Sequence, residues 1–481
     1  MERCFHIYMG IIMAIKTRCR KSFIVKFIVC LQVAVLSVGC PETNWVFPDH
    51  DAHVMPPECS DGDMHCTVNI LETCIGGKFG TLTVCDEYCD PVSGCVLDLP
   101  NADSYIWIAN TGEGTLSKVN TRNGREVARY LTCAYGDNRC DPSRTSVNLH
   151  GDVVVSNRGC GNCVVQIPAS SVTKFAASRM DCVDRDGNGI IDTSTGPSDI
   201  KAWGEDECML WSIELPFEAG FGDDPHGARA TAWDGRDDED TGLGGSVWVG
   251  TCDMYAQPNP VYVYKLNGDT GTVEERVQVE SASCAYGGAM DNDNGFWFLC
   301  LTTETITRVD VESLEYATRP TSCGYGITVD SHGRVWTGGF DFSALEQSCI
   351  ARYDPRTGEE RTAIVSWDPI TISTRPWLRG IAVGTALSAG FVWAAETSGK
   401  LYQIDAETLD VNLAYEMTGV HETIGVAVDF LGYVWMVDML GDCAYCYDPV
   451  TQRRVQVRVG SFPYTYSDMT GVQLRNTVLV H

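Results

Sequence analysis

Oxygen-bearing groups recur at every second position in one short stretch of the chain. Asp184, Asp186, Asn188 and Asp192 carry side-chain oxygens, and Ile190 would offer its backbone carbonyl. A hard cation such as Ca²⁺ prefers oxygen ligands of these kinds. The sequence therefore predicts a metal site formed by these five residues, and the alternative is an acidic turn that binds no metal.

The stretch resembles the first nine positions of an EF-hand or dockerin calcium loop. It departs from the family at position twelve, where Thr195 stands in place of the usual bidentate acid. Binding is expected to be weak unless Asp199 or Glu205 supplies the missing oxygens. Because Ca²⁺ offers no redox chemistry, its expected role is structural, to order the segment that contains the loop.

A second chemical pattern is a cysteine followed two positions later by a tyrosine and then a glycine. It occurs as Cys133-Ala-Tyr135-Gly, Cys284-Ala-Tyr286-Gly and Cys323-Gly-Tyr325-Gly. A tyrosine offers an apolar ring together with a hydroxyl that forms hydrogen bonds. Three equivalent tyrosines imply that the elements which position them also repeat.

The elements around these patterns do repeat. Residues 325–340 alternate apolar side chains, turn at Asp330-Ser-His-Gly and continue as a second strand. A third and a fourth strand follow each copy. One four-stranded sheet for roughly every 40 to 50 residues is typical of a β-propeller blade. Similar stretches begin at Ser104, Thr145, Arg229, Tyr286, Gly380 and Ile424.

The count of second strands predicts an all-β protein with seven blades. The first blade lacks an inner strand, and residues 469–474 are predicted to supply it and so to close the ring. In the second blade, a long insertion precedes a fourth strand at 208–215. The large side chains at the strand centres are interpreted as core packing between neighbouring sheets. These centres are Trp107, Val154, Trp248, Trp297, Trp336, Trp393 and Trp435.

In a propeller, the loops that enter each first strand and leave each second strand gather on one face. There we expect a rim that binds an unknown protein, peptide or small-molecule ligand, although the tyrosines could instead only seal the blades. On the same face, Cys252 would pair with Cys284 and Cys300 with Cys323, linking neighbouring blades. The predicted ligand-binding residues are Tyr135, Tyr286, Tyr325, Trp377 and Arg379.

The phrases GITVDSHGRVWTGG and IGVAVDFLGYVWMVD resemble those of the streptogramin B lyase propellers, over roughly residues 101–475. Active members of that family eliminate across an ester bond, using histidines and a glutamate near Mg²⁺. The resemblance implies His226 and Glu396 as catalytic candidates, and Arg379 stands where the family has a histidine. His226 and Glu396 belong to the third and sixth predicted blades, so only fragments of the family's arrangement are present.

Composition excludes other classes of function. Lysine and arginine number 35 against 64 acidic residues, a formal net charge of −29, so a polyanionic nucleic acid would be repelled. The sequence has no GxSxG or HExxH motif, and no nucleotide-binding glycine loop before a helix. His332 and His150 occupy equivalent hairpin turns and are expected to face solvent.

The N-terminus predicts export. Basic residues precede the apolar run 27–38, which has the layout of a secretory signal. The run ends at Cys40 in a sequence that resembles a bacterial lipobox, so Cys40 is the predicted lipidation site, and simple secretion is the alternative. The chain contains 23 cysteines, and six of them fall within residues 59–95. An oxidising compartment and disulfides explain them better than zinc does, because the segment has no paired Cys-x-x-Cys motifs.

The predicted organisation has three parts: a signal peptide at 1–39, a cysteine-rich segment at 40–100, and a seven-bladed propeller at 101–481 with an insertion at about 176–206. The favoured function is a monomeric ligand- or protein-binding scaffold in the cell envelope, anchored to the membrane by its N-terminal lipid. The alternative is a metal-dependent enzyme that cleaves a cyclic ester by elimination. Mg²⁺ is expected only for that enzyme, and Ca²⁺ only as a structural ion.

Overall fold

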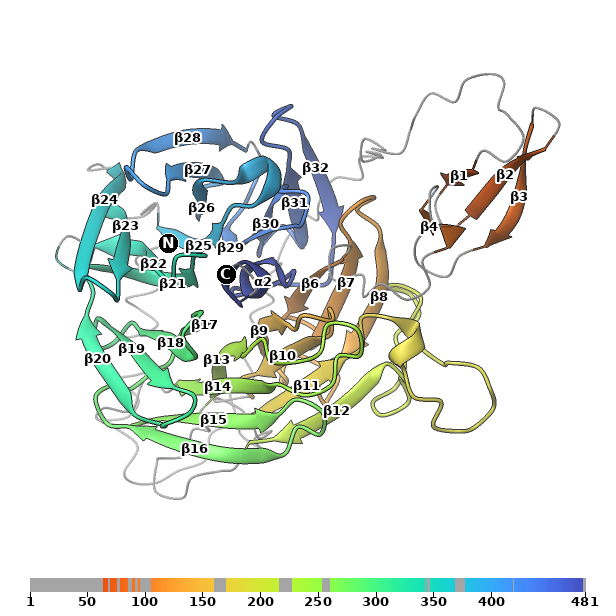
Figure 1. The fold of residues 1–481 in the computed structure, drawn as a ribbon, viewed down its shortest axis with the longest axis horizontal. Helices are drawn as coiled ribbons and strands as arrows, with labels where there is room; N and C mark the ends of the chain where they lie inside the picture. The colour runs from red at the N-terminus through yellow and green to blue at the C-terminus, as the bar shows by residue number, and fades with distance from the viewer. Residues whose placement is uncertain are drawn as a thin grey trace, which may run out of the picture.

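Seven antiparallel sheets stand around a central axis (Figure 1). The computed structural model describes residues 105–478, except 160–169, 216–226, 253–259, 342, 344–346, 368–376 and 418, together with the backbone of five short strands between residues 64 and 95. Six of the seven sheets have four strands and one has three. The protein is a seven-bladed β-propeller, as the repeats predict.

The blades follow one another in chain order. Blade one contains β6 (Tyr105–Asn110), β7 (Thr115–Asn120) and β8 (Glu126–Leu131). Blade two contains β9 (Pro142–Val147), β10 (Val153–Asn157), β11 (Ser171–Phe175) and β12 (Met209–Glu214). Blade three contains β13 (Gly227–Trp233), β14 (Ser246–Cys252), β15 (Val261–Asn267) and β16 (Val273–Val279). Blade four contains β17 (Gly287–Met290), β18 (Gly295–Cys300), β19 (Thr305–Asp310) and β20 (Tyr316–Pro320).

The remaining blades have the same four-stranded order. Blade five contains β21 (Cys323–Val329), β22 (Val335–Asp341), β23 (Gln347–Asp354) and β24 (Glu359–Trp367). Blade six contains β25 (Leu378–Val383), β26 (Phe391–Glu396), β27 (Lys400–Asp405) and β28 (Val411–Glu416). Blade seven contains β29 (Thr423–Val428), β30 (Val434–Asp438), β31 (Cys443–Tyr447) and β32 (Arg454–Arg458). Two short 3₁₀ helices, η1 (Arg179–Asp181) and η2 (Ala386–Ser388), lie in connections.

An aspartate at the first hairpin of a blade explains the repeated phrase. In blade five, Oδ2 of Asp330 accepts a hydrogen bond from Nε1 of Trp336 over 2.8 Å, and its Oδ1 accepts from the backbone N–H of His332 in the turn. A single carboxylate therefore fixes the turn and also satisfies the buried indole N–H. The same contact joins Asp291 to Trp297 at 2.7 Å and Asp429 to Trp435 at 2.9 Å.

The residues at the strand centres form the core, as predicted. All of them are at most 4% exposed and pack between neighbouring sheets. An indole buried in this way contributes apolar area and is not available to a ligand. The set is Trp107, Val154, Trp248, Trp297, Trp336, Trp393 and Trp435.

The C-terminal segment closes the ring, although the strand predicted at 469–474 is wrong. The preceding residues run beside β6, where Tyr464 N donates to Ala109 O and Trp107 N donates to Met469 O, each over 2.9 Å. These contacts satisfy part of the inner edge of blade one. Its sheet nevertheless keeps three strands, because the closing segment forms isolated contacts and no continuous ladder.

A helix replaces the end of that predicted strand. Its residues, Val472–Val478, form α2. Asp468 explains the change, because its carboxylate accepts hydrogen bonds from the backbone N–H groups of Thr470 (3.1 Å), Gly471 (2.7 Å) and Leu474 (3.1 Å). These groups at a helix start lack partners within the helix. Gly471 also adopts a φ of 82°, a left-handed conformation that turns the chain out of an extended path.

The helix α2 lies at the end of the channel where inner strands finish. The hydroxyl of Thr477 donates to the carbonyl of Val329, the last residue of β21, over 3.4 Å. Arg475 donates to the carbonyl of Leu149, just after β9, and pairs with Glu239 at 2.9 Å. Figure 1 shows α2 near the middle of the ring. The helix thus covers one end of the channel. The opposite end, where the inner strands begin, is called the mouth of the channel.

The N-terminal segment contributes β1 (Met64–Thr67), β2 (Ile70–Ile75) and β3 (Lys78–Val84) in one antiparallel sheet, and β4 (Cys89–Asp90) paired with β5 (Gly94–Cys95). Its predicted disulfides, the signal segment and Cys40 lie outside the described side chains. Among the described residues, no helix combines the length and the apolar character that crossing a membrane requires.

Candidate ligand site at the channel mouth

Inner strands from different blades bring similar side chains to the mouth of the channel. Arg144 is the third residue of β9, Arg229 the third of β13, Tyr325 the third of β21 and Arg379 the second of β25. Tyr286 stands directly before β17. Because the inner strands all start at this end, blades two to six place a tyrosine or an arginine at one level of the channel.

Tyrosines from three parts of the chain meet at this level. The hydroxyl of Tyr286 lies 2.5 Å from that of Tyr325 and 2.8 Å from that of Tyr464. The ring of Tyr466 lies 5.5 Å from the ring of Tyr325. Tyr464 and Tyr466 belong to the closing segment, so closure of the ring completes the group.

Four arginines surround these rings, at distances typical of cation–π contacts. The Cζ atom of Arg229 lies 4.0 Å from the centre of the Tyr286 ring, and that of Arg144 lies 4.3 Å from the centre of the Tyr466 ring. We call the whole group the arginine–tyrosine cluster. It consists of Arg144, Arg158, Arg229, Arg379, Tyr286, Tyr325, Tyr464 and Tyr466.

Two of the four arginines have carboxylate partners. Nη2 of Arg379 lies 2.7 Å from Glu422, and Arg158 pairs with Asp141. Both carboxylates therefore neutralise one guanidinium each.

The other two arginines form no salt bridge with any described residue. Arg144, which is fully buried, donates to the backbone carbonyls of Ser143 (2.7 Å) and Tyr286 (3.0 Å). Arg229 is 7% exposed and donates from Nη2 to the hydroxyl oxygen of Tyr464 over 3.0 Å. Buried charges are normally paired. Because these two are not, the described residues of the cluster carry more positive than negative charge.

The excess charge acts on Tyr464. Burial alone would raise the pKa of its hydroxyl, but the charges of Arg229, Arg158 and Arg144 outweigh burial and lower this pKa to about 6. A phenol normally titrates near pH 10. At neutral pH, the Tyr464 hydroxyl is therefore mostly ionised and offsets one of the unpaired guanidinium charges.

Arg229 and Arg379 occupy equivalent backbone irregularities. The pairing of β13 with β14 skips Arg229, and the pairing of β25 with β26 skips Arg379. Each is the extra residue of a β-bulge, a feature that redirects a side chain and is common beside functional sites. Two blades thus use the same device to aim an arginine at the mouth.

Several polar atoms of this region are buried without a hydrogen-bond partner among the described residues. They include Nε of Arg229, Nε of Arg379, the hydroxyl of Tyr466 and Oγ of Ser467. Tyr466 and Ser467 also line a cavity of about 10 Å³, which is room for about one water molecule or one ligand oxygen. An oxygen-bearing group placed there would satisfy the open hydroxyls of Tyr466 and Ser467.

Solved structures share this architecture. A Lactobacillus plantarum protein matches 75% of this chain and 98% of its own, with a TM-score of 0.50 and 13% identity. A streptogramin B lyase matches 70% of this chain and 92% of its own, with a TM-score of 0.41 and 16% identity. The chain thus shares the β-propeller fold with the Lactobacillus plantarum protein. A periplasmic gluconolactonase from Pseudomonas aeruginosa matches 75% of this chain and 97% of its own, with a TM-score of 0.49 and 13% identity.

Identities this low establish likeness of fold alone. No protein-family model and no curated protein matches the chain. The function of this propeller must therefore be argued from its own residues.

The structure brings together some of the predicted rim. Tyr286, Tyr325 and Arg379 belong to the arginine–tyrosine cluster. Tyr135 instead lies under the guanidinium of Arg139 at 4.6 Å, in a loop closed by a disulfide between Cys133 and Cys140.

Trp377 lies one residue before β25, and its ring centre is 5.2 Å from that of Phe340.

Sequence reasoning missed Arg144, Arg229, Tyr464 and Tyr466. The signal that could have found the first two is their place near the start of an inner strand.

Of the three catalytic candidates, the structure describes Glu396 and Arg379. His226 lies outside the described residues, and its role stays a prediction. Glu396 is fully buried and accepts hydrogen bonds from Tyr402 at 2.9 Å and from two serine hydroxyls. Arg379 pairs with Glu422. A base needs an acceptor directed at its substrate, whereas the carboxylate of Glu396 is fully buried and faces three hydroxyl donors of its surroundings.

One predicted disulfide is confirmed and the other is wrong. Cys252 is bonded to Cys284 and links blade three to the start of blade four. Cys323 is bonded to Cys349 within blade five, and Cys300 is a free, buried thiol. The first and third strands of a blade can approach closely enough for a bond, with a Cα–Cα distance of 5.9 Å here, so an inter-blade partner was not required.

The insertion of blade two carries the predicted calcium loop. Asp184, Asp186 and Glu207 place carboxylate oxygens within 4.8 Å of one another. Both oxygens of Asp184 also accept backbone N–H groups of the loop, from Gly187 at 2.8 Å and from Gly189 at 2.9 Å. The loop thus has the turn that the motif implies.

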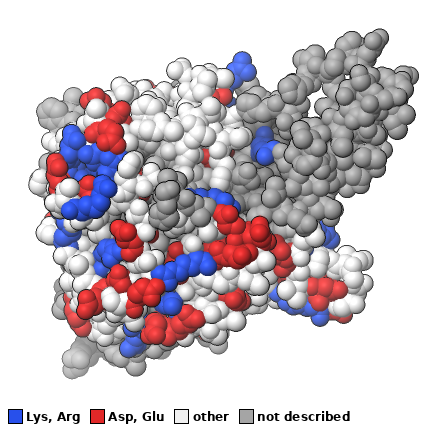
Figure 2. All heavy atoms as spheres, viewed as in Figure 1, with Lys and Arg blue, Asp and Glu red and all other residues white. Residues whose placement is uncertain are grey.

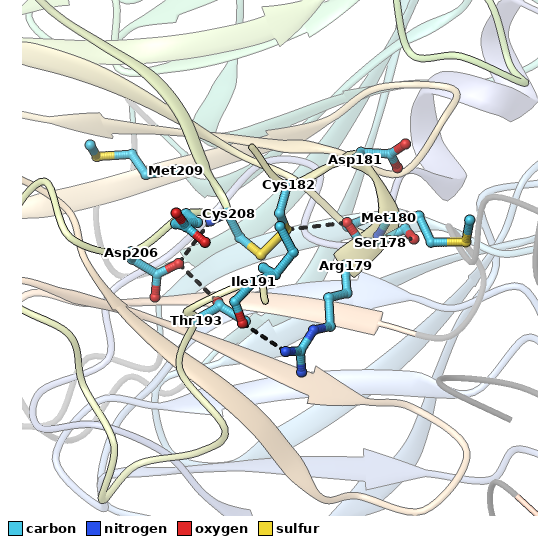
Figure 3. Close-up of a disulfide and its surroundings, with 12 residues drawn as sticks. Ser178, Arg179, Met180, Asp181, Cys182, Ile191, Thr193, Asp206, Cys208 and Met209 are labelled. Carbon is cyan, nitrogen blue, oxygen red and sulfur yellow. Dashed lines mark hydrogen bonds between the residues drawn. A yellow bond between two sulfur atoms is a disulfide. The ribbon is translucent and has the colours of Figure 1, made fainter. Parts of the chain in front are cut away.

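Glu207 joins this loop from a distant part of the insertion. Its carboxylate accepts the backbone N–H groups of Arg185 (2.6 Å) and Asp192 (2.8 Å). Cys208, the residue after Glu207, forms a disulfide with Cys182, which lies just before the loop (Figure 3). This bond holds Glu207 close to the start of the loop.

Asp199, which was considered as a replacement acid, is instead bound to Lys201 at 2.9 Å and to Thr195 at 3.0 Å. The third acid beside Asp184 and Asp186 is Glu207, not Asp199 or Glu205. Sequence reasoning could not choose it, because the path of the insertion between residues 192 and 207 was unknown.

The expectation that His150 faces solvent in the hairpin turn of blade two is wrong. It is 4% exposed, and its ring contacts Oδ2 of Asp181 at 2.8 Å and the carbonyl of Glu239 at 2.9 Å. Burial lowers the pKa of His150, but the hydrogen bond to Asp181 and the charge of Asp152 outweigh it and raise the pKa to about 9. His150 is therefore charged at neutral pH and ties the insertion to the propeller, while His332 is exposed as expected.

A larger cavity, of about 320 Å³, lies between blade one and the insertion. Two of the basic groups that line it, Lys118 and Arg179, already donate to the backbone carbonyls of Ala177 and Ile191. Among the described residues, the channel mouth therefore has buried donors without partners, whereas these two basic groups of the larger cavity already have partners.

Proposed function

We propose that this protein is an exported binding or scaffold propeller of the cell envelope, and that it holds a ligand at the channel mouth. The observation that carries the proposal is the arginine–tyrosine cluster. It gathers side chains from several blades at one point, and some of its buried donors have no partner among the described residues. Tyr325 and Tyr464 are only partly buried, so the cluster has an accessible side that a ligand can contact.

A binding role accounts for the cluster better than the alternative, a metal-dependent elimination of a cyclic ester. That reaction would need a base and an anion-stabilising group close together. Glu396 does not fit a Mg²⁺ ligand, because it is fully buried and belongs to none of the potential metal-binding groups among the described residues. No step is therefore assigned to Mg²⁺.

Export is supported by the disulfides. Four are present among the described residues, and such bonds persist in oxidising compartments. We propose attachment to the membrane through a lipid on Cys40. Replacing Cys40 with Ser should release the protein from the membrane fraction, and unchanged association would show that the lipid assignment is wrong.

Ca²⁺ is proposed as a structural ion of the insertion. Glu207 supplies the acidic group that the loop lacks at its twelfth position, next to Asp184 and Asp186. An ion among three carboxylates would offset their mutual repulsion and hold the insertion in one conformation.

The binding proposal is tested by thermal unfolding in the presence of a panel of polar small molecules and short peptides. At least one compound should raise the unfolding midpoint, and the Tyr286→Ala, Tyr325→Ala double variant should lose the shift. Tyr135→Ala, which changes a tyrosine outside the cluster, should keep it. Stabilisation that survives the double variant would contradict the proposal. So would Mg²⁺-dependent turnover of a cyclic ester that is lost in Glu396→Gln.

A further inference from the structure

We infer that the ligand at the channel mouth carries an oxyanion, a carboxylate or a phosphate group, and that Arg229 and Arg379 bind it together. The inference rests on the proposed binding function and adds the chemical class of the ligand. It depends on three independent observations: the bulges that hold the two arginines, their open donors, and the charge balance of the cluster.

The bulges come first. Arg229 in blade three and Arg379 in blade six are both residues that the ladder skips. In a regular strand the next residue would point to the opposite face, whereas a bulge lets an additional side chain turn toward the channel. Tyr325, which contacts the Tyr286 and Tyr464 hydroxyls, lies 5.4 Å from the Arg379 Cζ atom. Arg229 contacts Tyr286 and Arg379 contacts Tyr325, so the two arginines border one hydrogen-bonded group of tyrosines from two blades.

The open donors come second. Each of these arginines uses Nη2 for a protein partner, Tyr464 for Arg229 and Glu422 for Arg379. In both, Nε is buried and has no hydrogen-bond partner among the described residues. A guanidinium donates through a fixed fork that matches a carboxylate or a phosphate. An unfilled donor on each of two guanidinium groups that border the same group of tyrosines indicates a missing oxygen acceptor.

The charge balance comes third. The cluster contains four guanidinium groups, and Glu422 and Asp141 neutralise two of them. Ionised Tyr464 offsets one more, so at least one positive charge stays unmatched among the described residues. The chain as a whole has a formal net charge of −29, and Figure 2 shows acidic and basic groups interspersed on the visible surface. Four arginines at one buried point are therefore not a consequence of composition, and an anion would complete the balance.

The size of the cavity limits what can enter. A cavity of about 10 Å³ adjoins the cluster, and its lining includes Arg144, Tyr325, Tyr466 and Ser467. It accepts a single oxygen, which would satisfy the open hydroxyls of Tyr466 and Ser467. The rest of the ligand must lie outward, over Tyr325 and Tyr464. A ligand with a small anionic end and a ring or chain that packs on tyrosine fits this description.

The test is a calorimetric titration of the intact protein with inorganic phosphate and with benzoate, at constant ionic strength. One or both should bind, and Arg229→Gln and Arg379→Gln should each weaken binding by about tenfold or more. Binding of phosphate alone identifies a phosphate ligand, and binding of benzoate alone identifies a carboxylate. Arg319→Gln is the matched control. Arg319 lies in β20, the outer strand of blade four, and its Cζ atom is 3.7 Å from the centre of the Tyr353 ring, so it also contacts a tyrosine but lies outside the cluster. The substitution should leave affinity unchanged.

A spectroscopic readout on the wild-type protein covers the case in which a variant fails to fold. An anion bound beside ionised Tyr464 would disfavour that ionised form, so phosphate or benzoate should move the tyrosinate absorbance midpoint to higher pH. If neither anion binds while an uncharged compound stabilises the protein, the inference is wrong and the proposed binding function stands. If nothing in either experiment binds, both are wrong.

Discussion

Arg229 donates a hydrogen bond from Nη2 to the hydroxyl oxygen of Tyr464 over 3.0 Å, although 235 positions separate the two residues in the chain. The contact joins the inner strand of blade three to the segment that closes blade one. Ring closure places Tyr464 next to the guanidinium of Arg229. The positive charge of Arg229 lowers the pKa of the Tyr464 hydroxyl and so promotes its ionisation.

The first prediction concerns Tyr464. Ultraviolet titration of the folded protein should show one tyrosine that ionises near its pKa of about 6. Tyr464→Phe should remove this transition. Arg229→Gln should move it to higher pH, because the guanidinium charge favours the phenolate. A folded protein in which every tyrosine titrates near pH 10 would contradict the electrostatics described for the mouth.

The same ionisation has a signature in stability. The pKa of Tyr464 in the folded protein, about 6, lies below the unfolded value of about 10. Its contribution to the free energy of unfolding is therefore present above about pH 10 and is lost as pH falls through about 6. Denaturant unfolding of the wild type and of Tyr464→Phe should differ most at the alkaline end of this window.

The second prediction concerns the disulfides. Removing the bond between Cys252 and Cys284 by a double change to Ser should lower the free energy of unfolding by about 3 to 4 kcal/mol, the cost expected from a sequence separation of 32. Peptide mapping after alkylation without reductant should find Cys300 labelled. A peptide that joins Cys300 to Cys323 would overturn the pairing described for blade five.

The third prediction concerns His150. Its folded pKa of about 9 lies above the unfolded value of about 6.5. The stabilisation, roughly 3 kcal/mol, is thus fully present below about pH 6.5 and is lost as pH rises through about 9. Denaturation of His150→Gln should show a weaker alkaline loss than the wild type. His332→Gln changes an exposed turn residue and should behave like the wild type.

The fourth prediction concerns the calcium loop. Ca²⁺ should protect the insertion from limited proteolysis, and Asp184→Ala combined with Asp186→Ala should abolish the protection. Glu207→Gln should reduce it, while Asp199→Asn, at a carboxylate bound to Lys201, should not. Protection that depends on Asp199 and not on Glu207 would show that the ligand set is wrong. An insertion that is equally resistant with and without Ca²⁺ would reduce the loop to an acidic turn.

Much of the fold was predictable because its signals are local. The contact between Asp330 and Trp336 spans six residues of one hairpin, so its aspartate, turn glycine and tryptophan recur in the sequence at fixed spacing. The same periodicity placed Tyr286 and Tyr325 at equivalent positions, and the structure brings their hydroxyls to 2.5 Å from each other. The bond between Cys252 and Cys284 follows from the same equivalence of neighbouring blades.

The tertiary structure decided what depends on distant segments. Residues 469–474 have a strand-like phrase, yet capping by Asp468 turns the chain into α2. Glu207 reaches Asp184 only through the path of the insertion. Arg229 meets Tyr464 only because the ring closes. The sequence alone thus determined the repeated blade, whose contacts are made within a hairpin. Ring closure and backbone bulges decided the site, since periodicity carries no information about which distant side chains they bring together.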